Sequence, residues 1–291
     1  MKPVRKAVMP VAGLGTRVLP AAKATPKNLL NIVDRPILTY VVAEARAAGI
    51  EHIVFVTGRG QGAIEDYFDA LPELEAALEA RGRTEMLADL REVLARPGEM
   101  SFVRQSRPLG IGHAVSCARD LIGDEPFAVV YPDMVMAADP PALKQAVEAY
   151  ERVGGNIIVV EAAPEGEAHK YGIVSLAEGG SGRLQRMTGM VEKPAPGTEP
   201  SNLFISGRII LQPEIFDVLA AQETGARGEI ELTDAMARLM ADQTFHALEY
   251  EGTTYDCGDK LGLLRANVAF ALSHPDLGAG ARAMIEAELK R

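Results

Sequence analysis

The sequence is poor in the features of secreted and membrane-spanning proteins. It holds only 2 cysteines in 291 residues, Cys117 and Cys257, and they lie far apart along the chain. A disulfide framework is therefore excluded, and free thiols in a reducing compartment are expected. No window approaches the ~18 unbroken apolar residues of a membrane span, and the apolar run 7–11 is too short for a secretion signal. We expect a cytoplasmic protein without a membrane partner.

Positive charge is also scarce. The chain has 30 Lys and Arg against 40 Asp and Glu, a net charge of −10. Sequence-independent binding of nucleic acid needs a basic surface, so we expect no nucleic-acid partner. A small anionic ligand is not excluded, because a few cations focused in one cleft can hold phosphates on an acidic protein.

Several motifs of common enzyme classes are missing. Gly13 and Gly15 lack the third glycine of a dinucleotide fingerprint, because residue 18 is Val. The run 58–62 lacks the Lys-Ser/Thr ending of a P-loop and is predicted to be a turn. No Gly-x-Ser-x-Gly occurs, and the 5 histidines show no pairing with a nucleophile. Hydride transfer and nucleophilic hydrolysis are therefore disfavoured.

What the sequence does contain is an alternation of buried strands and helices. Apolar, β-branched runs and helical spacing predict the following elements in the first half: strands at 7–11, 53–57, 100–103 and 127–131, and helices at 37–48, 63–70, 71–94 and 113–121. This alternation predicts an α/β fold with a Rossmann-like, mostly parallel central sheet and helices on both faces.

The second half is less regular and predicts a small mixed β region. Its expected elements are helices at 143–153, 214–221, 233–241 and 261–272, strands at 156–161, 171–174 and 208–211, a hairpin turn at 179–182 and a loop at 255–259. No linker separates the two halves, so we expect a single domain over residues 1–291.

Polar residues follow the predicted strands of the first half. Gly13, Gln105 and Asp133 each come just after a strand end, which places them on the edge where α/β sheets bind ligands. A strand that opens into a glycine turn can bring backbone N–H groups close to an anion, and Arg17 and Lys27 add positive charge beside it. Asp133 could present an oxygen to Mg²⁺, which is held by one or two carboxylates and substrate phosphates.

The turn at residues 12–17, Ala-Gly-Leu-Gly-Thr-Arg, together with Pro26 and Lys27 resembles the signature of the sugar-1-phosphate nucleotidylyltransferases. Further stretches follow in the order of that family and resemble its bacterial UTP–glucose-1-phosphate uridylyltransferase branch. They are Val-Arg-Gln at 103–105, Gly-Ile-Gly-His-Ala at 110–114, Pro-Asp at 132–133, Tyr-Gly at 171–172, Val-Glu-Lys-Pro at 191–194, Ser-Asn at 201–202, Gly-Glu-Ile-Glu-Leu-Thr-Asp at 228–234 and Tyr-Asp-Cys-Gly at 255–258.

The resemblance implies an enzyme that transfers a uridylyl group from UTP to glucose 1-phosphate and releases pyrophosphate. The attacking phosphate oxygen would already be anionic, so the reaction needs no general base. Positioning and cations do most of the work in such transfers, which fits the missing His and Ser apparatus. In-line attack on the α-phosphorus would proceed without a covalent intermediate.

The resemblance also implies roles for individual residues. Nucleotide-binding residues would be Ala12, Gly13, Gly15, Thr16, Gln105 and Gly110. Catalytic cations would be Arg17 and Lys27, and Mg²⁺ would be held by Asp133 and Asp256. The sugar phosphate would be bound by Gly172, Glu192 and Lys193. Residues 1–140 would mainly bind the nucleotide, 141–260 the sugar phosphate, and 261–291 would form C-terminal helices.

Some residues depart from the family pattern. Asn28 and Asn31 stand where a Glu or Gln and a proline are usual, which bears on base selectivity. Two alternatives follow: a thymidylyltransferase that uses dTTP, and a non-catalytic paralogue that regulates a true uridylyltransferase. The family also implies a homodimer or homotetramer, although the apolar stripe at Leu261, Leu264, Val268, Ala271 and Leu272 would more often pack on its own domain.

Overall fold

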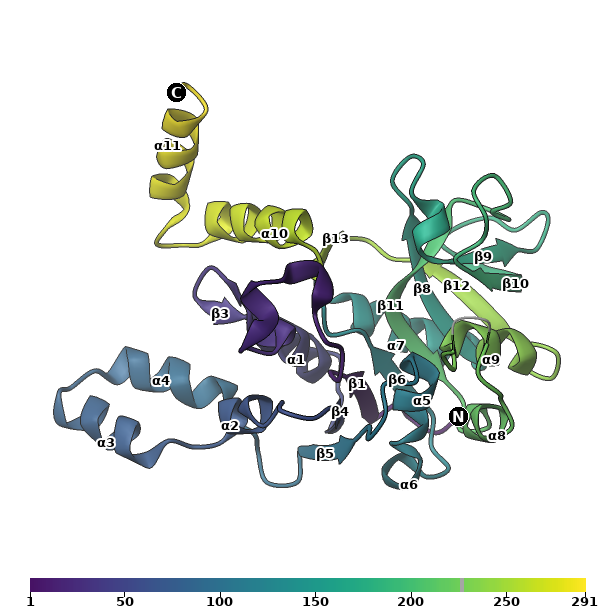
Figure 1. Cartoon of the computed structure of the whole chain (residues 1–291), viewed down its shortest axis with the longest axis horizontal. Helices are drawn as coiled ribbons and strands as arrows, with labels where there is room; N and C mark the ends of the chain where they lie inside the picture. Colours follow the sequence, from purple (N-terminus) through teal and green to yellow (C-terminus); the bar gives the residue numbers. More distant parts are fainter. Residues whose placement is uncertain (226–227) are drawn as a thin grey trace.

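The computed structural model describes residues 1–225 and 228–291. Its centre is a nine-stranded sheet in the order β5-β4-β1-β6-β11-β8-β12-β10-β9 (Figure 1). The strands are β1 (Lys6–Pro10), β4 (His52–Thr57), β5 (Met100–Arg104), β6 (Phe127–Val130), β8 (Asn156–Ala162), β9 (Gly172–Leu176), β10 (Leu184–Glu192), β11 (Leu203–Leu211) and β12 (Phe245–Glu249). Two small ribbons pair β2 (Asn31–Ile32) with β3 (Arg35–Pro36), and β7 (Met134–Ala137) with β13 (Thr253–Asp256).

The predicted α/β class is confirmed, and parallel pairing is concentrated in the first half of the chain. Strands β5, β4, β1 and β6 pair in parallel. Strand β11 then runs antiparallel to both β6 and β8, and β10 runs antiparallel to β12 and β9. The mixed region is more extensive than expected, because β12 was not predicted and β11 is longer than the predicted strand. Strands from both halves of the chain thus share one sheet.

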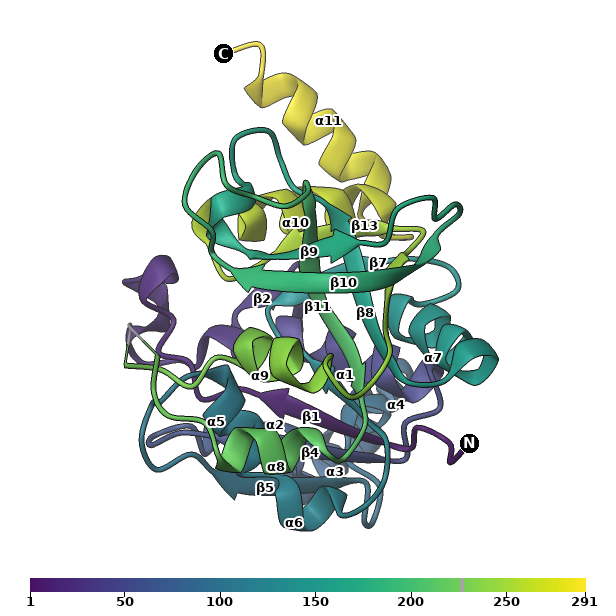
Figure 2. The same ribbon diagram turned by 90° about the vertical axis from the view of Figure 1, so that its right-hand side faces the viewer.

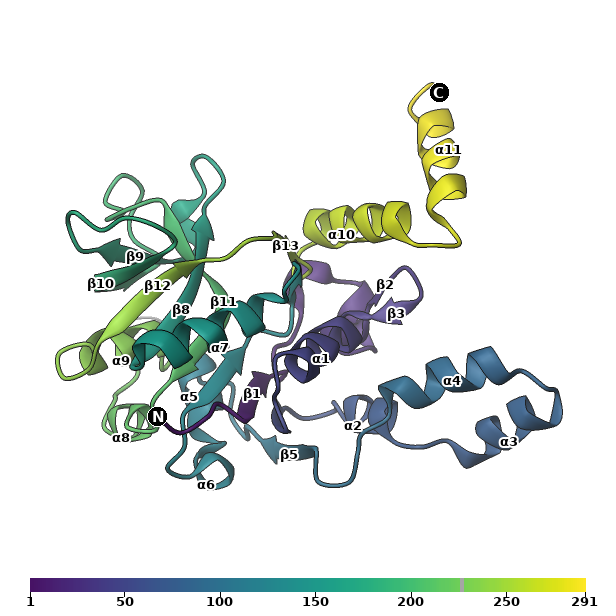
Figure 3. The same ribbon diagram turned by 180° about the vertical axis from the view of Figure 1, so that it is seen from behind.

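Helices cover both faces of the sheet, as predicted. On one face lie α1 (Ile37–Ala47), α2 (Ala63–Phe68) and α7 (Ala142–Val153), and on the other α5 (Ile111–Ser116), α6 (Arg119–Ile122), α8 (Ile215–Ala220) and α9 (Leu232–Leu239). Figure 3 shows α1 and α7 on the face seen from behind, and Figure 2 shows α8 and α9 on the other. Strand β1 sends Ala7 and Met9 into the first core and Val8 into the second, because successive strand side chains point to opposite faces.

Three predicted elements differ from the structure. The helix expected at 113–121 is two short helices, α5 and α6. The helical stretch 71–94 is a pair of packed helices, α3 (Pro72–Ala80) and α4 (Thr84–Val93), which turn at Gly82 with φ 63° and extend away from the sheet (Figure 1). The loop expected at 255–259 begins inside β13, whose partner β7 lies more than a hundred residues earlier and leaves no local pattern.

The C-terminal segment consists of α10 (Lys260–Ser273) and α11 (Gly278–Glu288), which lie at one end of the molecule (Figure 1). The expected stripe does not pack inward: Leu261, Leu264 and Val268 are 75%, 58% and 37% exposed. Leu263 and Phe270 pack against the core instead, so α10 carries apolar side chains on two sides. None of the helices among the described residues has both the length and the apolar character needed to cross a bilayer.

Candidate active site

A cavity of about 660 Å³ lies beside the carboxyl ends of β1 and β6 and the start of β9. It is lined by Arg17, Lys27, Ile111, Tyr131, Asp133, Met134, His169, Lys170, Tyr171, Gly172, Glu192, Lys193, Ile205, Glu231, Leu232, Thr233 and Asp256. Seven of the residues predicted from the sequence are among them, drawn from positions 17 to 256. The fold therefore gathers both predicted groups, the catalytic and metal-binding residues and the sugar-phosphate residues, around one space.

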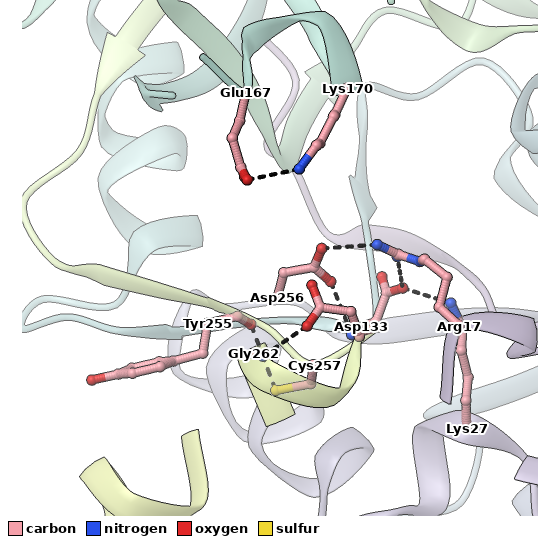
Figure 4. Close-up of polar contacts among 11 residues, drawn as sticks. Arg17, Lys27, Asp133, Glu167, Lys170, Tyr255, Asp256, Cys257 and Gly262 are labelled. Atoms are coloured by element: carbon pink, nitrogen blue, oxygen red, sulfur yellow. Dashed lines mark hydrogen bonds and ion pairs between the residues drawn. The ribbon is translucent and has the colours of Figure 1, made fainter. Parts of the chain in front are cut away.

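In one region of the cavity, two cations and two carboxylates form what we call the ion-pair cluster: Arg17, Lys27, Asp133 and Asp256 (Figure 4). Lys27 Nζ lies 2.5 Å from Asp133 Oδ2, and Arg17 Nη1 lies 3.1 Å from Asp256 Oδ2. Arg17 Nη2 is 3.9 Å from Asp133 Oδ2 and so bridges the two carboxylates. Every charge of the cluster therefore has an opposite charge beside it.

The two carboxylates of the cluster titrate differently. Burial would raise the pKa of Asp133, but the Lys27 ammonium and the Arg17 guanidinium together outweigh it and hold that pKa below its ordinary value. Burial raises the pKa of Asp256, and the neighbouring Arg17 guanidinium offsets this only in part. Asp133 is thus the stronger acid of the pair.

The donor set of the cluster suits Mg²⁺. A Cβ placed on Gly258 would lie 2.7 Å from Asp133 Oδ2 and 2.9 Å from Asp256 Oδ1, and still closer to Arg17 Nη2. Both carboxylates therefore face the same small space beside the Gly258 backbone, together with the Arg17 guanidinium. Within residues 1–225 and 228–291, no group of three or more His, Cys, Asp or Glu side chains is arranged to hold a metal ion. Two carboxylates leave most positions for water and substrate phosphate, which is the usual Mg²⁺ arrangement.

The glycine turn after β1 packs directly on Lys27. Gly15 has φ 65°, a left-handed conformation that favours glycine. A Cβ there would lie 2.9 Å from Ala22 Cβ and 3.0 Å from Lys27 Cβ, and one on Gly13 would lie 3.4 Å from Lys27 Cε. The glycines thus let the turn approach the lysine that reaches Asp133.

Another part of the cavity lining, which we call the Glu192 corner, is formed by Gly172, Glu192, Lys193 and Thr233. The Thr233 hydroxyl donates to Glu192 Oε2 at 2.8 Å, and Lys193 Nζ lies 3.5 Å from Glu192 Oε1. A Cβ on Gly172 would stand 3.0 Å from Glu192 Oε2 and 3.2 Å from Thr233 Oγ1. One carboxylate is therefore held at a fixed position beside a glycine that leaves it room.

Six predicted nucleotide-binding residues do not line the cavity: Ala12, Gly13, Gly15, Thr16, Gln105 and Gly110. The Gln105 amide lies 3.0 Å from both the Gly110 carbonyl and His113 Nδ1. Gly110 has φ 95°, and a Cβ there would lie 2.9 Å from the Ile230 carbonyl. His113 therefore orients the predicted base-binding glutamine, which is a structural role.

Asn28 is fully buried, and neither the nitrogen nor the oxygen of its side-chain amide has a hydrogen-bond partner among the described residues.

Several cavity residues were missed by sequence reasoning. Thr233 lies inside one of the motif stretches but had no predicted role, and Tyr131 directly precedes the Pro-Asp motif. Burial, with the nearby Glu192 carboxylate, raises the pKa of Tyr131, so its phenol keeps its proton. Lys170, immediately before Tyr171, pairs with Glu167 at 2.7 Å above the cluster (Figure 4).

A cysteine nucleophile is excluded at this site. Cys257 follows Asp256 directly, but it is only 1% exposed. Burial and the adjacent carboxylates raise the pKa of its thiol to about 12, so it stays protonated at neutral pH. The structure therefore shows a packed, protonated thiol rather than a nucleophile.

Comparison with known proteins identifies the class. The nucleotidyl transferase family matches residues 6–272. The chain is 48% identical to the UTP–glucose-1-phosphate uridylyltransferase of Bacillus subtilis (strain 168) over 277 residues, covering 95% of this chain and 94% of the relative. It is 41% identical to a UTP-bound UGPase structure from Acinetobacter baumannii, with a TM-score of 0.90 and coverage of 97% and 98% of the two chains. A UDP-glucose pyrophosphorylase complexed with UDP-glucose matches at 36% identity and TM-score 0.81, covering 92% of this chain and 98% of that one.

The chain therefore belongs to the nucleotidyl transferase family. The narrower resemblance drawn from the sequence motifs, to the bacterial UTP–glucose-1-phosphate uridylyltransferases, is confirmed by relatives that match over nearly its whole length.

Proposed function

We propose that this protein transfers the uridylyl group of UTP to glucose 1-phosphate and releases UDP-glucose and pyrophosphate. The observation that carries the proposal is the shared cavity. The ion-pair cluster, suited to the phosphates of a nucleotide, and the Glu192 corner, suited to a sugar, open into the same space. Two polyanions can meet there beside three cations, Arg17, Lys27 and Lys193.

A phosphate oxygen of glucose 1-phosphate attacks the α-phosphorus of UTP in line, and the bond to pyrophosphate breaks. Lys193 holds the sugar phosphate, and Arg17 and Lys27 stabilise the charge that develops as pyrophosphate leaves. In the free protein these two cations are paired with Asp133 and Asp256, so substrate binding exchanges one set of ion pairs for another. Asp133 and Asp256 would hold Mg²⁺, which neutralises phosphate charge when bound.

The two regions of the cavity receive their substrates from different parts of the chain. Residues 1–140 bind the nucleotide, with Ala12, Gly13, Gln105 and Gly110 at the uracil and Gly15 and Thr16 at the triphosphate. Residues 141–260 bind the sugar phosphate, whose hydroxyls contact Gly172 and Glu192. The placement of these six residues supports this division, because Ala12, Gly13, Gly15 and Thr16 lie in the turn after β1 and Gln105 and Gly110 are joined by a hydrogen bond in the loop after β5.

The test is pyrophosphate release from the purified protein with UTP, glucose 1-phosphate and Mg²⁺, beside dTTP and a metal-free control. We expect metal-dependent turnover with preference for UTP. Preference for dTTP would instead assign the protein to thymidylyl transfer. A folded protein that binds UTP but turns over neither nucleotide would overturn the proposal in favour of the regulatory alternative.

The exposed apolar side of α10 supports a homodimer or homotetramer. Leu261 and Leu264 are 75% and 58% exposed on a helix whose other side already packs on the core. Light scattering on the wild type should give two or four chains, and Leu264→Glu should lower that number. A monomeric wild type would refute the oligomer.

A cytoplasmic location fits the unpaired state of both cysteines, and cell fractionation tests it.

A further inference from the structure

An arginine lies at the centre of the sheet, outside the cavity. Arg208 on β11 is 0% exposed, and its guanidinium forms a two-pronged ion pair with Glu44 of α1. Nε lies 3.0 Å from Glu44 Oε1, and Nη2 lies 2.7 Å from Oε2. Glu44 Oε1 also accepts the Leu143 backbone N–H at the start of α7, at 2.9 Å.

The remaining N–H groups of Arg208 reach the turn that carries Asp133. Nη1 donates to the carbonyls of Tyr131 and Gly207, both at 3.2 Å, and Nη2 donates to the Met134 carbonyl at 2.8 Å. Tyr131 and Met134 flank the Pro132–Asp133 dipeptide on its two sides. One rigid guanidinium thus holds both ends of the four-residue segment from which the Asp133 side chain projects.

The middle of the same segment is held by a further backbone hydrogen bond. The Asp133 carbonyl accepts the Cys257 N–H at 2.8 Å, which connects it to the loop that carries Asp256. Arg208 from behind and Cys257 from the side therefore leave the Asp133 backbone little freedom. The position of the carboxylate relative to Asp256 follows from this arrangement.

Stability alone does not account for such a pair. A buried ion pair is weak evidence for stability, because apolar residues of similar volume often replace it without loss. What apolar residues cannot supply is a planar set of donors aimed at two carbonyls of one turn. Groups that orient metal-binding residues typically change metal affinity or activity 10–100-fold when removed.

We propose that Arg208, oriented by Glu44, is a positioning residue that fixes the Asp133 carboxylate for metal and nucleotide binding. The proposal rests on the proposed function only in assigning Asp133 to the metal. It predicts that substitution of Arg208 weakens metal binding by more than the accompanying loss of stability can explain.

The chain offers a matched control on the same helix. Arg46 of α1 makes an equivalent two-pronged pair with buried Glu99, with Nε and Nη2 each 2.8 Å from a carboxylate oxygen. It also donates to the carbonyls of Glu92 and Leu94, both at 2.9 Å. This pair lies away from the cavity. Arg46→Lys therefore removes the same kind of contacts as Arg208→Lys without touching the Asp133 turn.

The experiment measures Mn²⁺ binding to each variant with UTP bound, from the loss of the free Mn²⁺ EPR signal, with UTP alone as the blank. We expect Arg208→Lys to raise the Mn²⁺ dissociation constant 10–100-fold and the Mg²⁺ concentration for half-maximal rate in parallel. The KM for glucose 1-phosphate should stay within about twofold. Arg46→Lys should lower the melting temperature yet leave Mn²⁺ binding unchanged.

Unchanged Mn²⁺ affinity in Arg208→Lys, or an equal change in both variants, would overturn the proposal and leave Arg208 a structural residue. If Arg208→Lys does not fold, the double variant Glu44→Gln with Arg208→Gln tests the proposal instead, because it leaves no unpaired buried charge. We expect this double variant to bind Mn²⁺ at least tenfold more weakly than the wild type, and an unchanged affinity would overturn the proposal. A wild type that binds Mn²⁺ and UTP but makes no UDP-glucose would refute the proposed function alone.

Discussion

The two regions of the cavity are built on different principles. In the ion-pair cluster, two cations and two carboxylates neutralise one another, with contacts of 2.5 and 3.1 Å that incoming phosphates and metal would exchange. In the Glu192 corner, one carboxylate accepts a hydrogen bond from a threonine hydroxyl at 2.8 Å and occupies the room that a glycine leaves beside it. The cluster is organised to stabilise changing charge, whereas the corner is organised to recognise a shape. Changes in the first should mainly lower kcat, and changes in the second should mainly raise the KM for the sugar phosphate.

The largest effect is expected from Lys27→Met in the ion-pair cluster. The substitution keeps an unbranched side chain of similar length but removes the cation 2.5 Å from Asp133. Loss of one preorganised group that stabilises transition-state charge typically costs about 10²–10³-fold in kcat. Steady-state pyrophosphate release should show this loss with less than about a threefold change in the KM for glucose 1-phosphate.

Lys23→Met serves as the control, since Lys23 is an exposed lysine of the same loop that does not line the cavity. It should keep wild-type kcat. Equal losses in both variants, or a Lys27→Met defect confined to KM, would break the distinction between the two regions.

A smaller effect is expected from Gly172→Ala in the Glu192 corner. The new methyl group would lie 3.0 Å from Glu192 Oε2 and 3.2 Å from Ile205 Cδ1, so the carboxylate must shift. A misplaced hydrogen bond to a charged group is worth about 1.5 kcal/mol or more, so the KM for glucose 1-phosphate should rise about tenfold while the KM for UTP holds.

Gly189→Ala on neighbouring β10 is the matched control, because its nearest new contact is 3.5 Å from Ser175 Oγ, an ordinary distance. It should leave both KM values within about twofold. If Gly172→Ala instead lowered kcat and left the KM for glucose 1-phosphate unchanged, the Glu192 corner would act in the chemical step rather than in binding the sugar phosphate.

The smallest expected effect is on stability, and it distinguishes the two carboxylates of the ion-pair cluster. The pKa of Asp256 is raised, so its contribution to stability is full below its ordinary pKa of 3.8 and is lost as the pH rises through the folded value. The pKa of Asp133 is lowered, so its contribution is present above 3.8 and is lost as the pH falls through the folded value. At pH 7, Asp256→Asn should raise the melting temperature of the metal-free protein and Asp133→Asn should lower it.

Calorimetric scans from pH 3 to 8 would follow both variants. The difference from wild type should shrink for Asp256→Asn as the pH falls through the raised folded pKa toward 3.8, and for Asp133→Asn only as the pH falls below 3.8 toward the lowered folded pKa. Shifts of the same sign at pH 7 would show that the two carboxylates are not in opposite electrostatic situations.

The parallel half of the fold and its polar residues were predictable because their information is local. Strands β1, β4 and β6 form apolar runs that are largely buried on both faces. Glycines follow β1 and β4, and Asp133 follows β6, whereas the half-buried β5 is followed by Gln105. The same locality explains why Arg17, Lys27 and Asp133 were found at one edge of the sheet. Asp256 was identified through the family resemblance, and the structure adds that it ends β13.

The features that escaped prediction depend on contacts between distant residues. Strand β13 exists because it pairs with β7, and the Arg208–Glu44 pair joins residues 164 positions apart. The apolar stripe of α10 was taken as inward-facing, but Leu263 and Phe270 occupy the core instead and leave Leu261 and Leu264 exposed. A periodic pattern cannot tell which of two apolar sides of a helix meets the protein.

The central claim is that the cavity transfers the uridylyl group directly between two substrates, with cations and no protein nucleophile. The stereochemistry at the α-phosphorus tests it most directly. UTP that carries sulfur at one defined α-position would be converted to UDP-glucose, and the product configuration read by phosphorus NMR. A single in-line displacement predicts inversion. Retention would require two displacements and a covalent uridylyl-enzyme, and would contradict the account.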